Sequence, residues 1–105
     1  MDAVTAVSGS GPAYAFAFLE ALVAAGISVG LEEAVARKLA VHTVASSAAL
    51  VQETQKSFAE LRSEVASPGG TTEAGLNVLL GDDAWMQRIK ETVEAAVLRA
   101  KNLAE

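Results

Sequence analysis

The 105-residue chain contains no cysteine, one histidine and few aromatic residues, which make up 5% of it. Without cysteine it can form no disulfide framework and perform no thiolate chemistry. With His42 as the one histidine, a transition-metal site would need carboxylates from scattered positions, so we expect no metal. Basic residues are also scarce, 8 against 13 acidic ones, and the net charge of −5 disfavours nucleic acid as a partner.

Long hydrophobic runs are missing as well. The longest apolar-rich stretch, Pro12 to Ile27, is interrupted by Glu20 and Gly26 and is shorter than a membrane span requires. The N-terminus has no basic region of the kind that opens a signal peptide. We therefore expect a cytoplasmic protein that does not contact a membrane.

What the chain does contain is small apolar side chains. Hydrophobic residues make up 51% of it, and alanine, valine and leucine supply most of them. The length predicts a single domain over residues 1–105. Small side chains let helices approach closely but build a thin core, so we expect part of the apolar surface to be buried against another chain.

The apolar pattern predicts an all-α fold. No segment of useful length alternates between apolar and polar residues as a half-buried strand does. The residues around 32–51 carry apolar side chains on more than one face, which predicts a central, largely buried helix. For the first long helix, Ser10 is the expected N-cap and Gly26 is the expected stop at the C-terminal end. The expected helices are 13–25, 32–51, 58–65, 71–80 and 84 to the end.

Two glycine-containing segments interrupt these helices, and the first is Ser8–Pro12. Its Gly9 and Gly11 form a Gly-x-Gly pair, but Tyr14 stands where a dinucleotide fingerprint needs its third glycine. No buried strand precedes the pair either, which excludes a Rossmann phosphate loop. Two interpretations stay open: a helix N-terminus with a flexible lead-in, or a close backbone approach to a flat ligand or a partner chain.

The second segment, Ser67–Thr72, contains both proline and glycine, the two residues that most often interrupt regular secondary structure. Pro68 fixes its own φ, while Gly69 and Gly70 permit a sharp turn. Either threonine can cap the helix that follows, whose first N–H groups and positive dipole end favour a carboxylate or a phosphate. The alternative interpretation is a plain loop between helices with a threonine cap.

Read together, Val4–Tyr14 and Val65–Leu76 resemble the C-terminal domain of the pyrroline-5-carboxylate reductase family. The resemblance implies an all-α helical bundle that interlocks with a second copy into an intertwined homodimer, which in this family often assembles further, up to a decamer. It also implies an N-terminal Rossmann domain that binds NADPH or NADH and that these 105 residues lack. We therefore expect no cofactor on this chain alone and no catalysis by it.

The resemblance also assigns roles to particular residues. The substrate carboxylate is expected to be held by Ser67, Gly69, Gly70 and Thr71. Thr72 is expected to hydrogen-bond the ring nitrogen and to assist proton delivery to it, which makes it the candidate catalytic residue. The residues expected near the nicotinamide are Ser10, Gly11 and Pro12.

The function implied is reduction of 1-pyrroline-5-carboxylate to L-proline with NAD(P)H, an oxidoreductase step of proline biosynthesis.

In the stretches Gln55–Phe58 and Arg62–Ser63 the chain departs from the family, where many relatives have a His-Pro and a Lys-Asp pair. One alternative is a helical oligomerisation module that binds no small molecule. Another is the equivalent domain of a different NAD(P)-dependent reductase, against which the Ser-Pro-Gly-Gly-Thr-Thr run argues.

Overall fold

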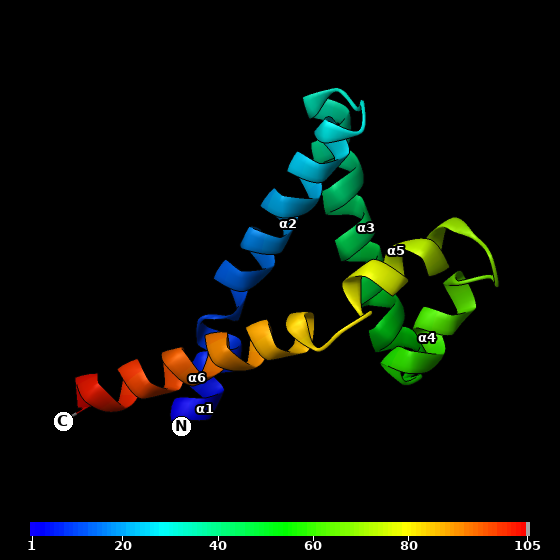
Figure 1. The fold of residues 1–105 in the computed structure, drawn as a ribbon. Coiled ribbons are helices and arrows are strands. Elements are labelled where there is room, and N and C mark those ends of the chain that lie inside the picture. The colour runs from blue at the N-terminus through cyan, green and yellow to red at the C-terminus, as the bar shows by residue number, and fades with distance from the viewer. Residues whose placement is uncertain (105) are drawn as a thin grey trace. The chain divides into compact units, whose positions relative to one another are not determined.

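All regular structure in the computed structural model, which describes residues 1–104, is helical (Figure 1), so the predicted all-α class is confirmed. The chain forms two compact units: one is Pro12–Phe58, and the other is Met1–Gly11 with the residues from Ala59 onward. The elements in chain order are α1 (Asp2–Val4), the π-helix η1 (Thr5–Gly9), α2 (Gly11–Ser28), α3 (Glu33–Thr54), α4 (Phe58–Val65), α5 (Thr71–Leu79) and α6 (Ala84–Ala104).

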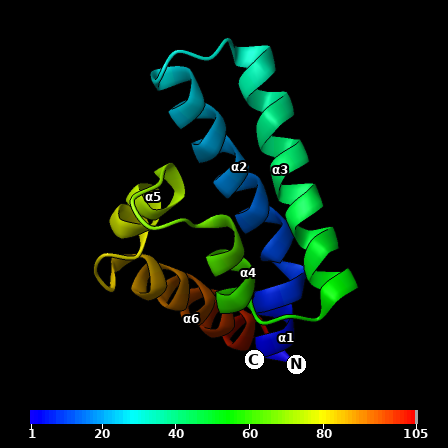
Figure 2. The ribbon, with the colours of Figure 1, turned by 90° about the vertical axis from the view of Figure 1, so that its right-hand side faces the viewer.

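In the unit Pro12–Phe58, α2 and α3 form a helical hairpin (Figure 2) whose arms meet at their connected ends, where Gly26 lies against Ala36, and diverge away from them (Figure 1). α2 ends in a Schellman motif: the Leu31 N–H donates to the Gly26 carbonyl and the Gly30 N–H to the Ile27 carbonyl, both at 3.0 Å. Gly30 takes φ = +113°, which strains any residue with a side chain. The expected stop at Gly26 was therefore wrong, because α2 continues to Ser28 and Gly30 ends it.

Gly26 has a different role, which is to let the two helices of the hairpin approach. A Cβ atom at this position would lie 3.3 Å from Leu31 Cδ1 and 3.4 Å from Ala36 Cβ. Both distances are tighter than ordinary van der Waals contact between carbon atoms. The missing side chain therefore allows Leu31 and Ala36 to pack directly on α2.

Helix α3 is less buried than its sequence predicts. Only Ala36 and Ala40 are buried along it, and Leu39 remains 52% exposed. Because α2 covers only the alanine face of α3, most of the remaining apolar side chains stay in contact with solvent. The expectation of a largely buried central helix was wrong for the single chain.

The Ser8–Pro12 segment does not interrupt the chain as expected. η1 continues into the next helix through Ser10, whose φ of −86° and ψ of −20° are helical and whose N–H donates to the Thr5 carbonyl at 2.9 Å. An N-cap residue normally has extended backbone angles, so Ser10 is not a conventional cap. Pro12 is tolerated because it stands in the first turn of α2, where its missing N–H has no partner to lose.

As a result, Asp2–Ser28 forms one 27-residue helical run with a mean hydropathy of 1.4 over its most apolar window, none of which is buried. By length and composition this run could cross a membrane, so the expectation that the stretch is too short was wrong. The same two properties are found in helices that soluble proteins bury and in signal sequences.

In the other unit, the N-terminal elements α1 and η1 pack against α6. Ala6 lies at this contact with 1% of its surface exposed. α6 begins at Ala84, whose N–H donates to Asp82 Oδ1 at 2.9 Å. The Asp82 side chain thus closes the turn before α6.

Gly75, inside α5, and Gly81, just after its C-terminal end, allow a matched test of how tightly the backbone packs where α5 ends. A Cβ atom at Gly81 would collide with the Asn77 carbonyl oxygen, whereas one at Gly75, inside α5, would meet no atom within 4 Å. We expect Gly81→Ala to destabilise the fold by about 1–3 kcal/mol, because the backbone must shift. Gly75→Ala should be neutral or stabilising by up to about 1 kcal/mol, because alanine favours the helix. Thermal melts of both variants at one protein concentration check this; equal melting temperatures would contradict it.

Candidate substrate-binding loop

The loop between α4 and α5 is built on a tight turn. The Gly70 N–H donates to the Ser67 carbonyl at 2.9 Å, and Gly69 between them has φ = +74°. With Pro68 before it, this is the residue pattern of a type II turn, which needs glycine at its third position. A Cβ atom at Gly70 would lie only 3.1 Å from the Ser67 carbonyl oxygen. Gly69 therefore supplies the positive φ of the turn, and Gly70 avoids a tight contact with the Ser67 carbonyl.

Helix α5 begins directly after this turn, and its N-cap is Gly70, with φ = −87° and ψ = 178°. The expectation that Thr71 or Thr72 caps the helix was wrong, because the two threonines form its first two positions and no side chain caps it. Their backbone N–H groups therefore point out of the helix end, where the dipole favours an anion.

The loop carries three hydroxyl groups, on Ser67, Thr71 and Thr72. Within residues 1–104 none of them takes part in a hydrogen bond of the structure, although other serines and threonines of the chain bond back to helix carbonyls. Thr72 is half-buried, while Ser67 and Thr71 are exposed. The loop thus offers uncommitted donors and acceptors around one helix end.

One side chain that the sequence interpretation did not single out also belongs to this loop. Glu73, the third residue of α5, accepts the Gly69 N–H on Oε1 at 3.2 Å. In a capping box the acidic residue at this position reaches back to the N-cap N–H. Here it reaches one residue further, because the N–H of Gly70 is already bonded within the turn. The sequence signal that was available is an acidic residue three positions after Gly70.

The residues expected near a nicotinamide lie apart from this loop in the sequence. Ser10 joins η1 to α2, and a Cβ atom at Gly11 would meet nothing within 4 Å, so the backbone there is open to approach. In the described residues, no hydrogen bond connects Ser10 or Gly11 to the Ser67–Thr72 loop. The five proposed substrate-binding residues, in contrast, lie together in the Ser67–Gly70 turn and the first two positions of α5.

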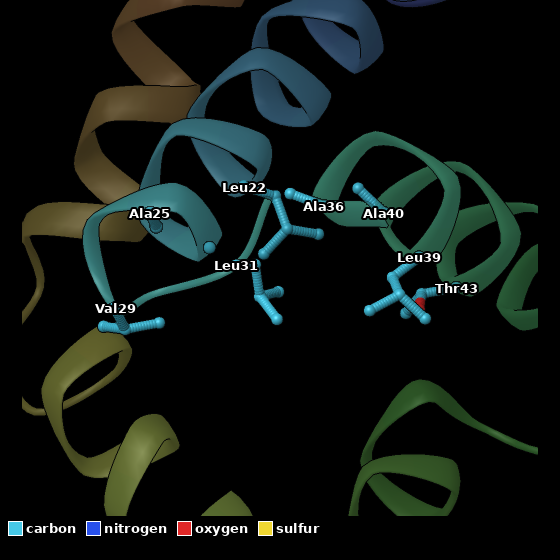
Figure 3. Close-up of a pocket in the computed structure, with 9 residues that line it drawn as sticks. Leu22, Ala25, Val29, Leu31, Ala36, Leu39, Ala40 and Thr43 are labelled. Atoms are coloured by element: carbon cyan, nitrogen blue, oxygen red, sulfur yellow. The ribbon is translucent and has the colours of Figure 1, made fainter. Parts of the chain in front are cut away.

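The described part of the chain contains no group of three or more histidine, aspartate or glutamate residues arranged to hold a metal ion. The α2–α3 hairpin carries an apolar hollow of about 390 Å³, with Leu22, Leu31 and Leu39 at its walls (Figure 3). The residues that line it are Leu22, Ala25, Gly26, Val29, Leu31, Ala36, Leu39, Ala40 and Thr43. With no charged side chain it suits an apolar partner better than a small polar substrate.

Comparison with known proteins defines the class to which this helical domain belongs. Residues 1–103 match the family described as pyrroline-5-carboxylate reductase dimerisation. The chain belongs to that family, as its two glycine-containing segments predict.

Individual relatives give the same result. The chain is 47% identical over 105 residues to a pyrroline-5-carboxylate reductase of Synechocystis and 41% identical over 104 residues to one of Arabidopsis thaliana. These alignments cover 100% and 99% of this chain but only 39% and 37% of the relatives, so the chain spans less than half of their length.

Solved structures agree with the sequence comparison. The fold is similar to that of a Plasmodium falciparum pyrroline carboxylate reductase with NADP bound, with a TM-score of 0.93, 33% identity and coverage of 100% of this chain and 40% of that one. A pyrroline-5-carboxylate reductase of Coxiella burnetii gives a TM-score of 0.93 at 41% identity, covering 97% and 37% of the two chains.

Proposed function

We propose that this chain is the substrate-binding and dimerisation domain of a pyrroline-5-carboxylate reductase, which reduces 1-pyrroline-5-carboxylate to L-proline with NADPH or NADH. The observation that carries the proposal is the geometry of the Ser67–Thr72 loop in a domain of this family. A type II turn and an uncapped helix start place backbone N–H groups and three uncommitted hydroxyls side by side. That arrangement suits a small cyclic carboxylate.

Within this site the carboxylate is proposed to lie against the start of α5. Ser67, Gly69, Gly70 and Thr71 form its binding surface, with the hydroxyls and the helix dipole favouring the negative charge. Because the Gly70 N–H is bonded to the Ser67 carbonyl, Gly70 contributes the shape of the turn rather than a donor. The ring nitrogen then lies toward Thr72, whose half-buried hydroxyl is uncommitted.

The reaction makes modest demands on these residues. A hydride adds to the imine carbon, the C=N double bond becomes a single bond, and the ring nitrogen takes one proton. The protein has to hold the ring in one orientation and supply a hydrogen-bonding path for that proton. Orientation alone accounts for several kcal/mol of barrier reduction in well-positioned reactions. The proposed role of Thr72 is to bond the nitrogen that becomes protonated.

The described residues do not fit the dinucleotide itself. They contain no strand and hence no βαβ unit, and Tyr14 replaces the third glycine of the fingerprint. Following the family resemblance, we place NADPH or NADH in a Rossmann domain N-terminal to this one. Ser10, Gly11 and Pro12 are then proposed to approach its nicotinamide end.

A second copy of the chain is the proposed partner for the exposed apolar surface. No large hydrophobic side chain is fully buried in the described chain, and the only buried hydrophobic residues are Ala6, Ala36 and Ala40. The family to which the chain belongs is a dimerisation family. We propose an interlocked homodimer, with further assembly up to a decamer, in the cytoplasm. Asp2–Ser28 is then covered by protein rather than by lipid.

The proposal is tested by comparing the 105-residue chain with the complete reductase. The chain alone should oxidise no NADPH above the blank when mixed with pyrroline-5-carboxylate, because it has no dinucleotide fold. The complete reductase should turn over and should also bind L-proline, as measured by calorimetry. An oligomerisation module would bind no L-proline in either form. Turnover by the 105-residue chain would contradict the proposed place of the cofactor.

A further inference from the structure

Glu73 places a carboxylate of the protein itself in the proposed substrate site. Its Oε1 accepts the N–H of Gly69, one of the groups proposed to hold the substrate carboxylate. The side chain is half-buried, which restricts how far it can move into solvent. Within residues 1–104 no lysine or arginine forms an ion pair with it, so its negative charge is not neutralised.

The hydrogen bonds of the turn show what remains for a ligand. Gly69 donates to Glu73 and Gly70 donates to the Ser67 carbonyl, so both glycine N–H groups are occupied in the structure. The unused groups are the N–H groups of the first turn of α5 and the loop hydroxyls. A ligand carboxylate can reach the Gly69 N–H only if Glu73 leaves it. Wherever it binds on this loop, it also approaches a like charge, which is unfavourable.

We propose that Glu73 is an internal competitor of the substrate, a specificity-determining residue that occupies the Gly69 N–H and lowers the affinity of the loop for carboxylate anions. This inference rests on the proposed function, because it assumes that the Ser67–Thr72 loop is the carboxylate site. Binding then exchanges one carboxylate for another at the Gly69 N–H.

The test measures binding of tetrahydro-2-furoate, an anionic five-membered ring without the titratable nitrogen, to the complete reductase by calorimetry. We expect Glu73→Gln to bind it about three- to tenfold more tightly than the wild type at low salt, because one like charge is removed. Glu73→Ala should tighten binding similarly. The ratio between variant and wild type should shrink toward one at about 1 M salt, where charges are screened. The neutral amide of the same ring should show no difference.

A matched control removes the same charge elsewhere. Glu94 is exposed on α6 and forms no hydrogen bond or ion pair in the described chain, so Glu94→Gln should leave tetrahydro-2-furoate binding unchanged. Wild-type-like binding by Glu73→Gln together with weaker binding by Glu73→Ala would overturn the inference, since Glu73 would then only support the turn. If neither the wild type nor Glu73→Gln binds the anion, the proposed function fails, and this inference fails with it.

Discussion

Replacing Thr72 by alanine in the complete reductase should lower kcat/KM by about one to two orders of magnitude. That is the size expected for the loss of one hydrogen bond that assists proton delivery to the substrate nitrogen. The hydroxyl is uncommitted in the structure and Thr72 is not the cap of α5, so its removal should hardly affect the fold. The measurement is steady-state kinetics beside a melting curve, with a change in the free energy of unfolding below about 1 kcal/mol.

Thr72→Ser is the control for this experiment, because it keeps the hydroxyl and should retain most of the activity. Thr71→Ala provides a second comparison, since Thr71 is exposed and is proposed to contact only the carboxylate. That variant should raise KM more than it lowers kcat. Wild-type kcat/KM in Thr72→Ala, or a loss of activity explained entirely by unfolding, would reduce Thr72 to a structural residue of the loop.

The second large effect concerns the α2–α3 hairpin, where Leu39→Glu should weaken self-association at least about 100-fold. Leu39 lines the apolar hollow beside Leu22 and Leu31 and is 52% exposed in the single chain. If a second copy covers this hollow, the new carboxylate must be buried without a partner, which costs several kcal/mol. Sedimentation equilibrium at micromolar concentration should show a dimer or larger for the wild type and a dissociating species for the variant.

The control carries the same substitution outside the hairpin. Leu103 lies in the last turn of α6, is 69% exposed and lines no part of the hollow. Leu103→Glu should therefore associate nearly as the wild type does. A folded Leu39→Glu variant with wild-type association would show that the hollow is not the contact surface. A wild-type chain that is a stable, cooperatively folded monomer at micromolar concentration would contradict the proposed dimer altogether.

Much of the fold follows from the sequence because helices depend on local signals. The lack of strand-like alternation predicts the all-α class, and the Gly81–Asp83 turn marks the gap between α5 and α6 correctly. The start of α5 at Thr71 also follows from the glycines before it. These features depend on residues within one turn of each other, so neighbouring sequence is sufficient to predict them.

Features that depend on distant residues were predicted less well. From the sequence, either Gly26 or Gly30 could end α2. In the structure Gly26 is the position where Ala36 approaches α2, and Gly30 takes the positive φ that ends the helix. The burial of α3 was overestimated because amphipathic pattern alone does not say which chain covers a face. The bond from Gly69 to Glu73 is local in sequence, but it also depends on the left-handed conformation of Gly69, which brings the two groups together.

The all-alanine interior of the single chain has a consequence for how the protein acquires its structure. If the large side chains become buried only between copies, folding and association form one equilibrium governed by mass action, and the melting temperature rises with protein concentration. A newly made chain would display the apolar faces of α2 and α3 until it meets another. Its yield of native protein would then depend on synthesis rate and on protection from aggregation as well as on its own stability.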